Sequence, residues 1–318
     1  MKKILVISET IFSDRLYDTL RFDEFSKLEI DLISSDEINL LQERYIENIK
    51  KKIIRRFLFK IFRFIRLIHR YVVPYGQMNS SASDHFKIDT NEWHWIKKNT
   101  LKAIIFIYSR VALCRHLSFY LLKNLVPKID KDLEVRFSNY DKVFLFSLGN
   151  LKPFFVVPLH NFFKKRNIKT ICYIQSWDNP STKGYALFKP DIILTWTELM
   201  RNEIKNYMDY PIKKTYAVGS PLFKDYKLDE DRNESILFAT KSPKTYPHNS
   251  FISEMIAIEA KKNNIDFTVR IHPLAITQKF INESNDILKL SKKYGFNVLL
   301  PNIDNKNLLN KDYDKIAN

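Results

Sequence analysis

Residues 172–206 read CYIQSWDNPSTKGYALFKPDIILTWTELMRNEIKN, and this stretch decides the expected fold. Two short apolar runs, residues 171–174 and 192–196, are rich in branched side chains, which is typical of buried parallel strands. A loop dense in hydrogen-bonding side chains, residues 175–184, follows the first run. Because ligands in an open α/β sheet bind beyond the carboxyl ends of the strands, we expect a functional site at this loop.

Strand-like and helix-like patterns alternate on both sides of this stretch, which predicts an α/β fold with two doubly wound, Rossmann-like domains. Thr197 is expected to cap the helix that follows the second strand, with Glu198 in its first turn. The expected strands are 4–7, 28–33, 142–148, 170–174, 191–196, 216–218, 236–239, 267–271 and 297–300. The expected helices are 12–25, 153–166, 197–207, 251–263 and 276–294.

The charged segment 228–235 marks a domain boundary, so we expect an N-terminal domain at 1–227 and a C-terminal domain at 228–318. Within the first domain, residues 36–135 read as a helical insertion without a convincing strand, and 92–125 as one or two helices. The second domain has about three expected strands, fewer than a complete nucleotide-binding fold uses. This domain is therefore either unusually small or incomplete because the chain is truncated, and we expect the second.

Composition points to an anionic partner and a reducing compartment. The chain of 318 residues has 52 basic and 36 acidic residues, a formal charge of +16, which suits nucleic acid, an acidic membrane or a phosphorylated substrate. The two cysteines, Cys114 and Cys172, both lie in apolar contexts and are expected to be core thiols. The first apolar run is too short for a signal peptide, and no run of about 18 apolar residues occurs. We expect a cytoplasmic protein.

Residues 50–73, KKKIIRRFLFKIFRFIRLIHRYVV, contain nine Lys or Arg and no acid. The apolar positions 53, 54, 57, 61, 64, 65 and 68 predict one face of an amphipathic helix. One interpretation is a peripheral contact with an anionic membrane, with long basic side chains reaching toward headgroups. The other is an ordinary surface helix packed by its apolar face, and both can hold together. The candidate membrane contacts are Arg55, Arg56, Lys60, Arg63, Arg66 and Arg70.

Three motifs give the chain a resemblance to a known family. Residues 175–184, QSWDNPSTKG, are followed by PDIILTW at 190–196; AVGSPLFKD lies at 217–225 and RIHP at 270–273. Their order and spacing resemble those of bacterial surface and capsular polysaccharide glycosyltransferases of the GT-B type, and of the related glycerophosphotransferases that build teichoic acid. The resemblance covers about residues 140–300. It implies two Rossmann-like domains that face each other across a cleft, and it departs from the glycerophosphotransferases where their loop histidine is replaced by Asp178.

The resemblance implies transfer of a sugar from a nucleotide sugar to a lipid-linked or polysaccharide acceptor, without a metal and without a cofactor, at the inner face of the plasma membrane. Asp178 is the candidate base and His272 a candidate group for charge on the leaving diphosphate. Each has a structural alternative, a turn or capping aspartate and a histidine that fixes Pro273. The candidate donor and phosphate-binding residues are Thr240, Lys241, Ser242, Arg270, Gly219 and Ser220. The candidate acceptor-binding residues are Trp177, Asn179 and Lys183; Trp177 is alternatively a packed side chain and Lys183 a solvent-exposed one.

Three other functions stay open at this point. CDP-glycerol-type glycerophosphoryl transfer would use a similar cleft. A truncated, non-catalytic relative that binds the membrane is suggested by the end of the chain at residue 318. Nucleic-acid binding rests on the charge alone, because no helix-turn-helix, aromatic RNA-binding strand or zinc spacing occurs in the sequence, and we expect no nucleic-acid partner.

Overall fold

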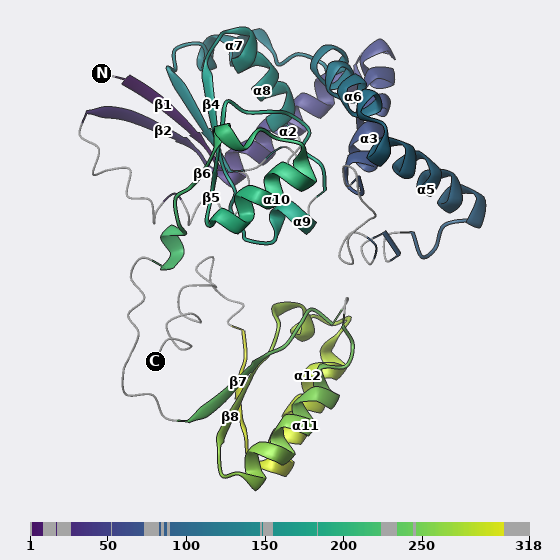
Figure 1. The fold of residues 1–318 in the computed structure, drawn as a ribbon, viewed down its shortest axis with the longest axis vertical. Coiled ribbons are helices and arrows are strands. Elements are labelled where there is room, and N and C mark those ends of the chain that lie inside the picture. Colours follow the sequence, from purple (N-terminus) through teal and green to yellow (C-terminus); the bar gives the residue numbers. More distant parts are fainter. Residues whose placement is uncertain are drawn as a thin grey trace. The chain divides into compact units, whose positions relative to one another are not determined.

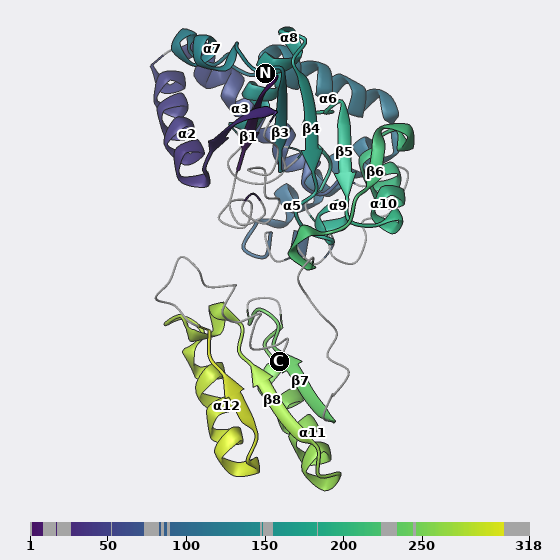
Figure 2. The ribbon, with the colours of Figure 1, turned by 90° about the vertical axis from the view of Figure 1, so that its left-hand side faces the viewer.

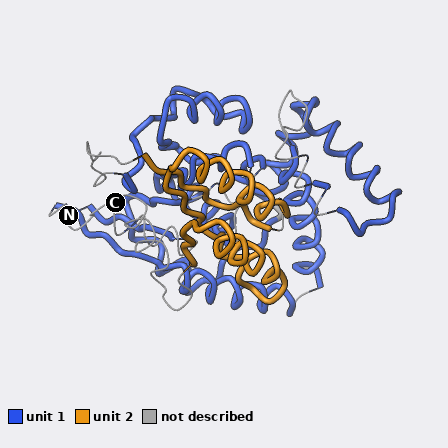
Figure 3. The backbone as a smooth tube through the Cα atoms, turned by 90° about the horizontal axis from the view of Figure 1, so that it is seen from below, with its two compact units in different colours: residues 1–224 blue, residues 225–318 orange. Residues whose placement is uncertain are grey.

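The computed structural model describes residues 2–8, 17, 27–51, 53–72, 83, 86–87, 90–146, 148, 155–182, 184–223, 234–243 and 246–301. The chain divides into two compact units, residues 1–224 and 225–318, coloured separately in Figure 3, and each is described by itself. The expected boundary at 227/228 lies outside the described residues. So do the candidate Lys183 and, apart from residue 17, the expected helix 12–25.

Unit 1 is an α/β unit built on a six-stranded parallel sheet (Figures 1 and 2). Its strands are β1 (Lys2–Ile7), β2 (Leu28–Ile33), β3 (Lys142–Leu145), β4 (Lys169–Tyr173), β5 (Ile192–Thr195) and β6 (Thr215–Ala217). They lie in the order β2-β1-β3-β4-β5-β6, so the direction of winding reverses between β1 and β3. The expected parallel pairing of the first two strands is confirmed, with Ile4 opposite Ile30.

The alternation of apolar side chains along the strands fills both faces of this sheet. Leu5 pairs with Val143 and Ile7 with Leu145, and all four belong to the large core of unit 1. Val6, which lies between Leu5 and Ile7 on β1, points to the opposite face, where it packs with Phe146 and Tyr173. Successive side chains of a strand alternate between faces, so a parallel sheet buried on both sides needs such continuous apolar runs.

The helices that contribute to the large core include α2 (Ser35–Lys50), α7 (Lys131–Phe137), α8 (Val156–Lys165) and α10 (Glu198–Met208). Helix α2 begins after Ser34, whose hydroxyl accepts a hydrogen bond from the Glu37 N–H. Helix α10 begins after Thr197, whose hydroxyl accepts from the Met200 N–H. This confirms the cap expected from the sequence, and it satisfies one of the backbone donors that a helix start leaves without an intrahelical partner.

The helical insertion contains three further helices, α3 (Ile53–His69), α5 (Trp95–Arg110) and α6 (Ala112–Leu125), which pack on one another. The predicted apolar face of α3 is only partly buried. Ile65 and Ile68 lie in the core, whereas Ile53, Ile54, Phe57 and Phe64 are exposed. Of the two interpretations of this face, the packed surface helix therefore fits Ile65 and Ile68 but not the exposed Ile53, Ile54, Phe57 and Phe64.

Unit 2 has a three-stranded parallel sheet, ordered β7 (Ser235–Ala239), β8 (Asp266–Arg270), β9 (Asn297–Leu299). Helices α11 (Asn249–Lys262) and α12 (Ile281–Tyr294) connect the strands and pack against each other (Figure 1). Ala257, Val269 and Ile287 are among the residues of a small core between these helices and the sheet.

The expected helix 276–294 begins later than predicted. Residues Pro273–Ile276 form a short 3-10 turn instead, and Thr277 returns to an extended conformation, with φ −76° and ψ 151°. His272 caps this turn, since its Nδ1 accepts from the Leu274 N–H at 3.0 Å. Helix α12 then starts at Ile281 and ends at Gly295, whose φ of +83° is favourable for glycine.

Candidate functional site

The loop singled out by the sequence follows β4 at the carboxyl edge of the unit 1 sheet. The Ile174 N–H donates to the Leu194 carbonyl at 2.9 Å, so the pairing of β4 and β5 extends to the start of the loop. Trp196 directly follows β5, and its indole Nε1–H donates to the Ile174 carbonyl at a distance of 2.9 Å. The loop therefore starts from a backbone position fixed by both strands, at the edge where ligands of parallel sheets bind.

Asp178 organises the loop through both its carboxylate and its carbonyl. Oδ1 accepts from the Ser176 hydroxyl at 2.5 Å, and Oδ2 accepts from the Thr182 hydroxyl at 3.0 Å. The Asp178 carbonyl accepts from the Ser181 and Thr182 N–H groups, which starts the short helix α9 (Asn179–Thr182). This geometry is that of the turn aspartate weighed as the structural alternative. Each carboxylate oxygen accepts one of these hydroxyls and keeps a second lone pair, so a role as base requires only that an acceptor hydroxyl reach this oxygen.

The three candidate acceptor residues have different surroundings. Trp177 is 68% exposed, so the expectation of a packed tryptophan was wrong. Asn179, two residues later, is only 7% exposed and offers an acceptor little surface. Lys183 lies outside the described residues. The loop thus holds Asp178 by hydrogen bonds and presents the Trp177 ring to solvent.

The end of the loop is fixed to the end of helix α3. Gly184 has φ +80°, and a Cβ atom on it would lie 2.4 Å from the Arg70 carbonyl oxygen. The Tyr185 N–H donates to the His69 carbonyl at 2.6 Å, and His69 Nδ1 donates to the Ala186 carbonyl at 3.0 Å. Only glycine combines this backbone angle with so close an approach. The glycine of the motif therefore has a packing reason that the sequence did not show.

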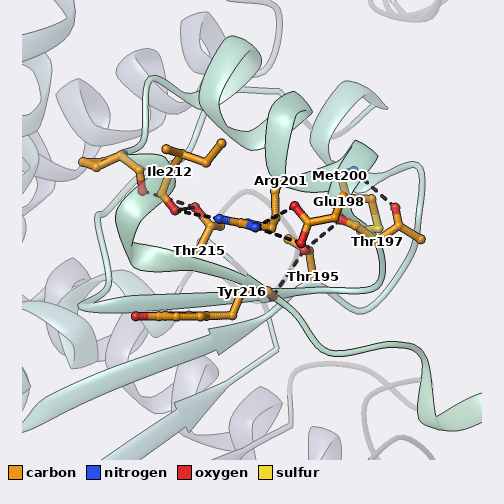
Figure 4. A network of polar contacts seen from close by, with 9 residues as sticks. Thr195, Thr197, Glu198, Met200, Arg201, Ile212, Thr215 and Tyr216 are labelled. Atoms are coloured by element: carbon orange, nitrogen blue, oxygen red, sulfur yellow. Dashed lines mark hydrogen bonds and ion pairs between the residues drawn. The ribbon is translucent and has the colours of Figure 1, made fainter.

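A polar network joins the first turns of α10 to the carboxyl end of β5 and to the segment that leads into β6 (Figure 4). The Thr195 hydroxyl donates to the Thr197 carbonyl at 3.2 Å, and Arg201 pairs with Glu198 at 2.6 Å. Arg201 also donates to the Ile212 carbonyl at 3.4 Å, and the Thr215 hydroxyl, at the start of β6, donates to the same carbonyl at 3.2 Å. These contacts fix the position of α10 beside β5 and β6.

Gly219 and Ser220, two candidate phosphate-binding residues, follow β6 at the same edge. Gly219 has φ +83° with no atom within 4 Å of an added Cβ, so its conformation rather than crowding favours glycine. Its carbonyl accepts from the Tyr173 hydroxyl at 3.0 Å, and burial raises the pKa of Tyr173 above its ordinary value. The structure thus places these two residues in unit 1, whereas the other candidate donor residues belong to unit 2.

In unit 2 the candidates lie at the carboxyl ends of β7 and β8. The Thr240 N–H donates to the Arg270 carbonyl at 2.9 Å, and the Thr240 hydroxyl accepts from the His272 N–H at 2.8 Å. His272 also caps the following turn through Nδ1, as its structural alternative proposed, so the neutral ring carries its proton on Nε2. Burial, followed by the charge of Arg270, lowers the pKa of His272, which keeps the ring neutral at pH 7.

Asn249 is the residue of this site that the sequence analysis missed. It is fully buried and closes the loop between β7 and α11. Its Oδ1 accepts from the Lys241 N–H at 2.9 Å, while its Nδ2 donates to the Lys241 and Tyr246 carbonyls and to the Glu283 carboxylate. An asparagine two residues before the expected helix 251–263 was the available signal.

The donor-side candidates Lys241 and Ser242 lie on the loop that Asn249 holds. Lys241 is exposed and Ser242 is half-buried. Arg270, the last residue of β8, is also half-buried. The three side chains therefore stand at the carboxyl edge of unit 2 with their backbones fixed, an arrangement suited to an anionic group.

No group of three or more His, Cys, Asp or Glu side chains that could hold a metal ion occurs within the described ranges. The sequence contains three Asp-x-Asp pairs. Asp130 and Asp132 lie at the start of α7, where Asn48 donates to Asp130 and Arg44 pairs with Asp132. The other two pairs, Asp229 with Asp231 and Asp312 with Asp314, lie outside those ranges. Comparison of the chain with protein-family models gives no match, and neither does comparison with curated proteins.

Proposed function

We propose that the protein is a glycosyltransferase of the GT-B type, with two Rossmann-like domains, that moves a sugar from a nucleotide sugar to a lipid-linked or polysaccharide acceptor. The observation that carries the proposal is the exposed Trp177 on a loop that Asp178 and Gly184 hold in place at the carboxyl edge of a parallel sheet. An exposed aromatic ring on a fixed loop offers a flat apolar face to a sugar or to the lipid part of an acceptor.

In the proposed reaction, the acceptor hydroxyl oxygen attacks the anomeric carbon while the bond from that carbon to the diphosphate oxygen breaks. The hydroxyl proton passes to a lone pair of the Asp178 carboxylate that the Ser176 and Thr182 hydroxyls leave open. Negative charge develops on the leaving nucleoside diphosphate. In unit 2, the Arg270 guanidinium, the Lys241 ammonium and the Nε2–H of neutral His272 are the groups that would stabilise this charge.

The first test incubates the full chain with bacterial membranes and either radiolabelled nucleotide sugars or CDP-glycerol. We expect label from a nucleotide sugar to enter the acceptor fraction, and we expect EDTA to leave the rate unchanged. Trp177→Ala should lower the rate about tenfold or more, whereas Trp177→Phe, which keeps an aromatic ring, should retain most of it. Transfer from CDP-glycerol instead would establish glycerophosphoryl transfer. No transfer from either donor would contradict the proposal.

We also propose a peripheral position at an anionic membrane, to which helix α3 contributes. Arg56, Lys60 and Arg63 are exposed on this helix together with Ile53 and Phe57, and Arg70 is exposed directly after its end. The candidates Arg55 and Arg66 are half-buried, and burial lowers the pKa of the Arg66 guanidinium. The variant Arg56→Glu/Arg63→Glu should weaken binding to vesicles that contain phosphatidylglycerol. Unchanged binding of this variant would show that the basic face of α3 has only a structural role.

A further inference from the structure

Helices α5 and α6 form an elbow with an angle of 100° at Val111. No single helix among the described residues is long and apolar enough to cross a membrane; this bent pair reaches the required length and composition only when its two members are taken together. Residues 93–129, which contain the elbow, carry seven Lys or Arg and no Asp or Glu. An acid-free segment of this length is a distinct feature in a chain with 36 acidic residues.

The inner side of the elbow is packed and its angle is fixed. Leu101 and Ile105 of α5 belong to a core cluster with Ile68 of α3. Arg115 of α6 is 1% exposed, and its Nη1 donates to the Tyr108 and Ser109 carbonyls at 3.0 and 2.8 Å. The carbonyls at the end of a helix lack partners within the helix and favour a cation. Arg115 of α6 thus provides a hydrogen-bond donor, from across the bend, for the carbonyls at the end of α5.

The outer side of the elbow is apolar and basic. Its exposed large apolar side chains surround the bend, and Leu113 reaches 74% exposure. Lys102, Arg110 and Lys123 are exposed among them, and the Arg110 guanidinium lies 4.4 Å from the centre of the Phe106 ring. Large apolar side chains exposed this densely on two consecutive helices are typical of a surface that binds a partner. The exposed apolar residues are Phe106, Ile107, Val111, Leu113, Leu117 and Tyr120.

We propose that the α5–α6 elbow is a second membrane-binding element, which inserts its outer apolar side chains into the interface of an anionic bilayer. Helices of 16 and 14 residues are about 24 and 21 Å long, shorter than the hydrocarbon core of about 30 Å, so each lies in the interface. The absence of acids over residues 93–129 matches anionic headgroups, and apolar side chains mixed with basic ones are typical of interfacial helices. The inference is independent of glycosyl transfer.

The test measures co-sedimentation of the full chain with vesicles of phosphatidylglycerol and phosphatidylcholine, and with vesicles of phosphatidylcholine alone. Leu113→Gln/Leu117→Gln removes two exposed leucines of the elbow. We expect it to lower the partition coefficient for the anionic vesicles about tenfold or more. The matched control, Val135→Gln/Leu199→Gln, changes residues of α7 and α10 with 71% and 70% exposure and should bind like the unaltered protein.

Because all four substituted residues are exposed, both variants should keep the circular dichroism spectrum and thermal transition of the parent chain. Binding of the elbow variant equal to that of the control would overturn the proposal. So would a lipid-free dimer, seen by sedimentation velocity, that the elbow variant converts to a monomer, since the outer side would then serve a second copy of the chain.

Discussion

A Cβ atom on Gly184 would lie 2.4 Å from the carbonyl oxygen of Arg70, so the end of the Trp177 loop and the end of helix α3 touch through their backbones. Neither backbone can give way as a flexible side chain would, and this contact explains why a glycine follows Lys183 in the motif. The loop is therefore supported from an element that lies more than a hundred residues earlier in the chain.

Gly184→Ala should lower the free energy of unfolding by about 2–5 kcal/mol, because the substitution combines an unfavourable φ with a backbone clash. Gly219→Ala is the matched control. It has nearly the same φ, +83° against +80°, but open space around the added atom, so it should cost only about 1–2 kcal/mol. Urea unfolding of both variants gives the comparison. Equal losses would show that the Arg70 contact does not constrain residue 184.

The burial of His69 predicts that the free energy of unfolding decreases in mildly acidic solution. It is fully buried between Ala186 and Ser118, and burial lowers its pKa from 6.5 to about 4. Because the folded state binds the proton more weakly than the unfolded state, the stabilisation is complete above pH 6.5 and is lost as the pH falls from 6.5 to 4. The loss amounts to roughly 3 kcal/mol.

His69→Gln should be less stable at pH 7 and should show a smaller decrease between pH 6.5 and 4, measured by urea unfolding at closely spaced pH values. The exposed His116 of helix α6 provides the control. His116→Gln should keep the pH dependence of the unaltered protein, and an equal effect of the two substitutions would refute the assignment to His69.

Asn249→Ala should destabilise unit 2 by about 3 kcal/mol or more, because it leaves the Lys241 N–H and several buried acceptors without their partner. Asn263 makes one exposed bond to the Glu259 carbonyl, so Asn263→Ala should cost only about 0.5 kcal/mol. Hydrogen exchange of amides in β7 and α11 measures the local effect. Similar protection in the two variants would count against a closing role for Asn249.

Substitution of Asp178 distinguishes a structural role of this residue in the loop from a chemical role in the transfer reaction. Asp178→Asn keeps an oxygen acceptor for the loop hydroxyls, so it should change stability by only about 0.5–1 kcal/mol. If the carboxylate also serves as base, the same variant should lower the rate of transfer about 10²-fold or more. Thermal unfolding and the transfer assay give the two values, and a stable variant with full activity would leave Asp178 as a turn residue alone.

Local patterns predicted much of the framework. Strand β2 was expected at 28–33 and is found at Leu28–Ile33, since its apolar residues continue directly to a capping serine. The Thr197 cap was equally visible, because a hydroxyl residue followed by a glutamate and an apolar spacing is a local signal. The 3-10 turn at 273–276 was missed. The apolar residues of this turn continue the helical spacing of α12, and only the cap formed by His272 sets the turn apart from the helix.

The site was less predictable because its supporting contacts join distant residues. The role of Gly184 depends on its contact with Arg70, and the role of Asn249 on its hydrogen bond to Glu283. Neither partner is near in sequence. The exposure of Trp177 and of Phe57 could not be inferred either, since an apolar side chain in a pattern does not reveal whether a neighbouring element covers it. The motifs therefore located the loops without showing what holds them.

The contacts between residues 69–70 and residues 184–186 have a consequence for the construction of the loop. The His69 carbonyl and imidazole bond to Tyr185 and Ala186, and the Arg70 backbone packs on Gly184. The segment that ends the Trp177 loop is thus anchored on a helix of the insertion as well as on the sheet from which the loop starts.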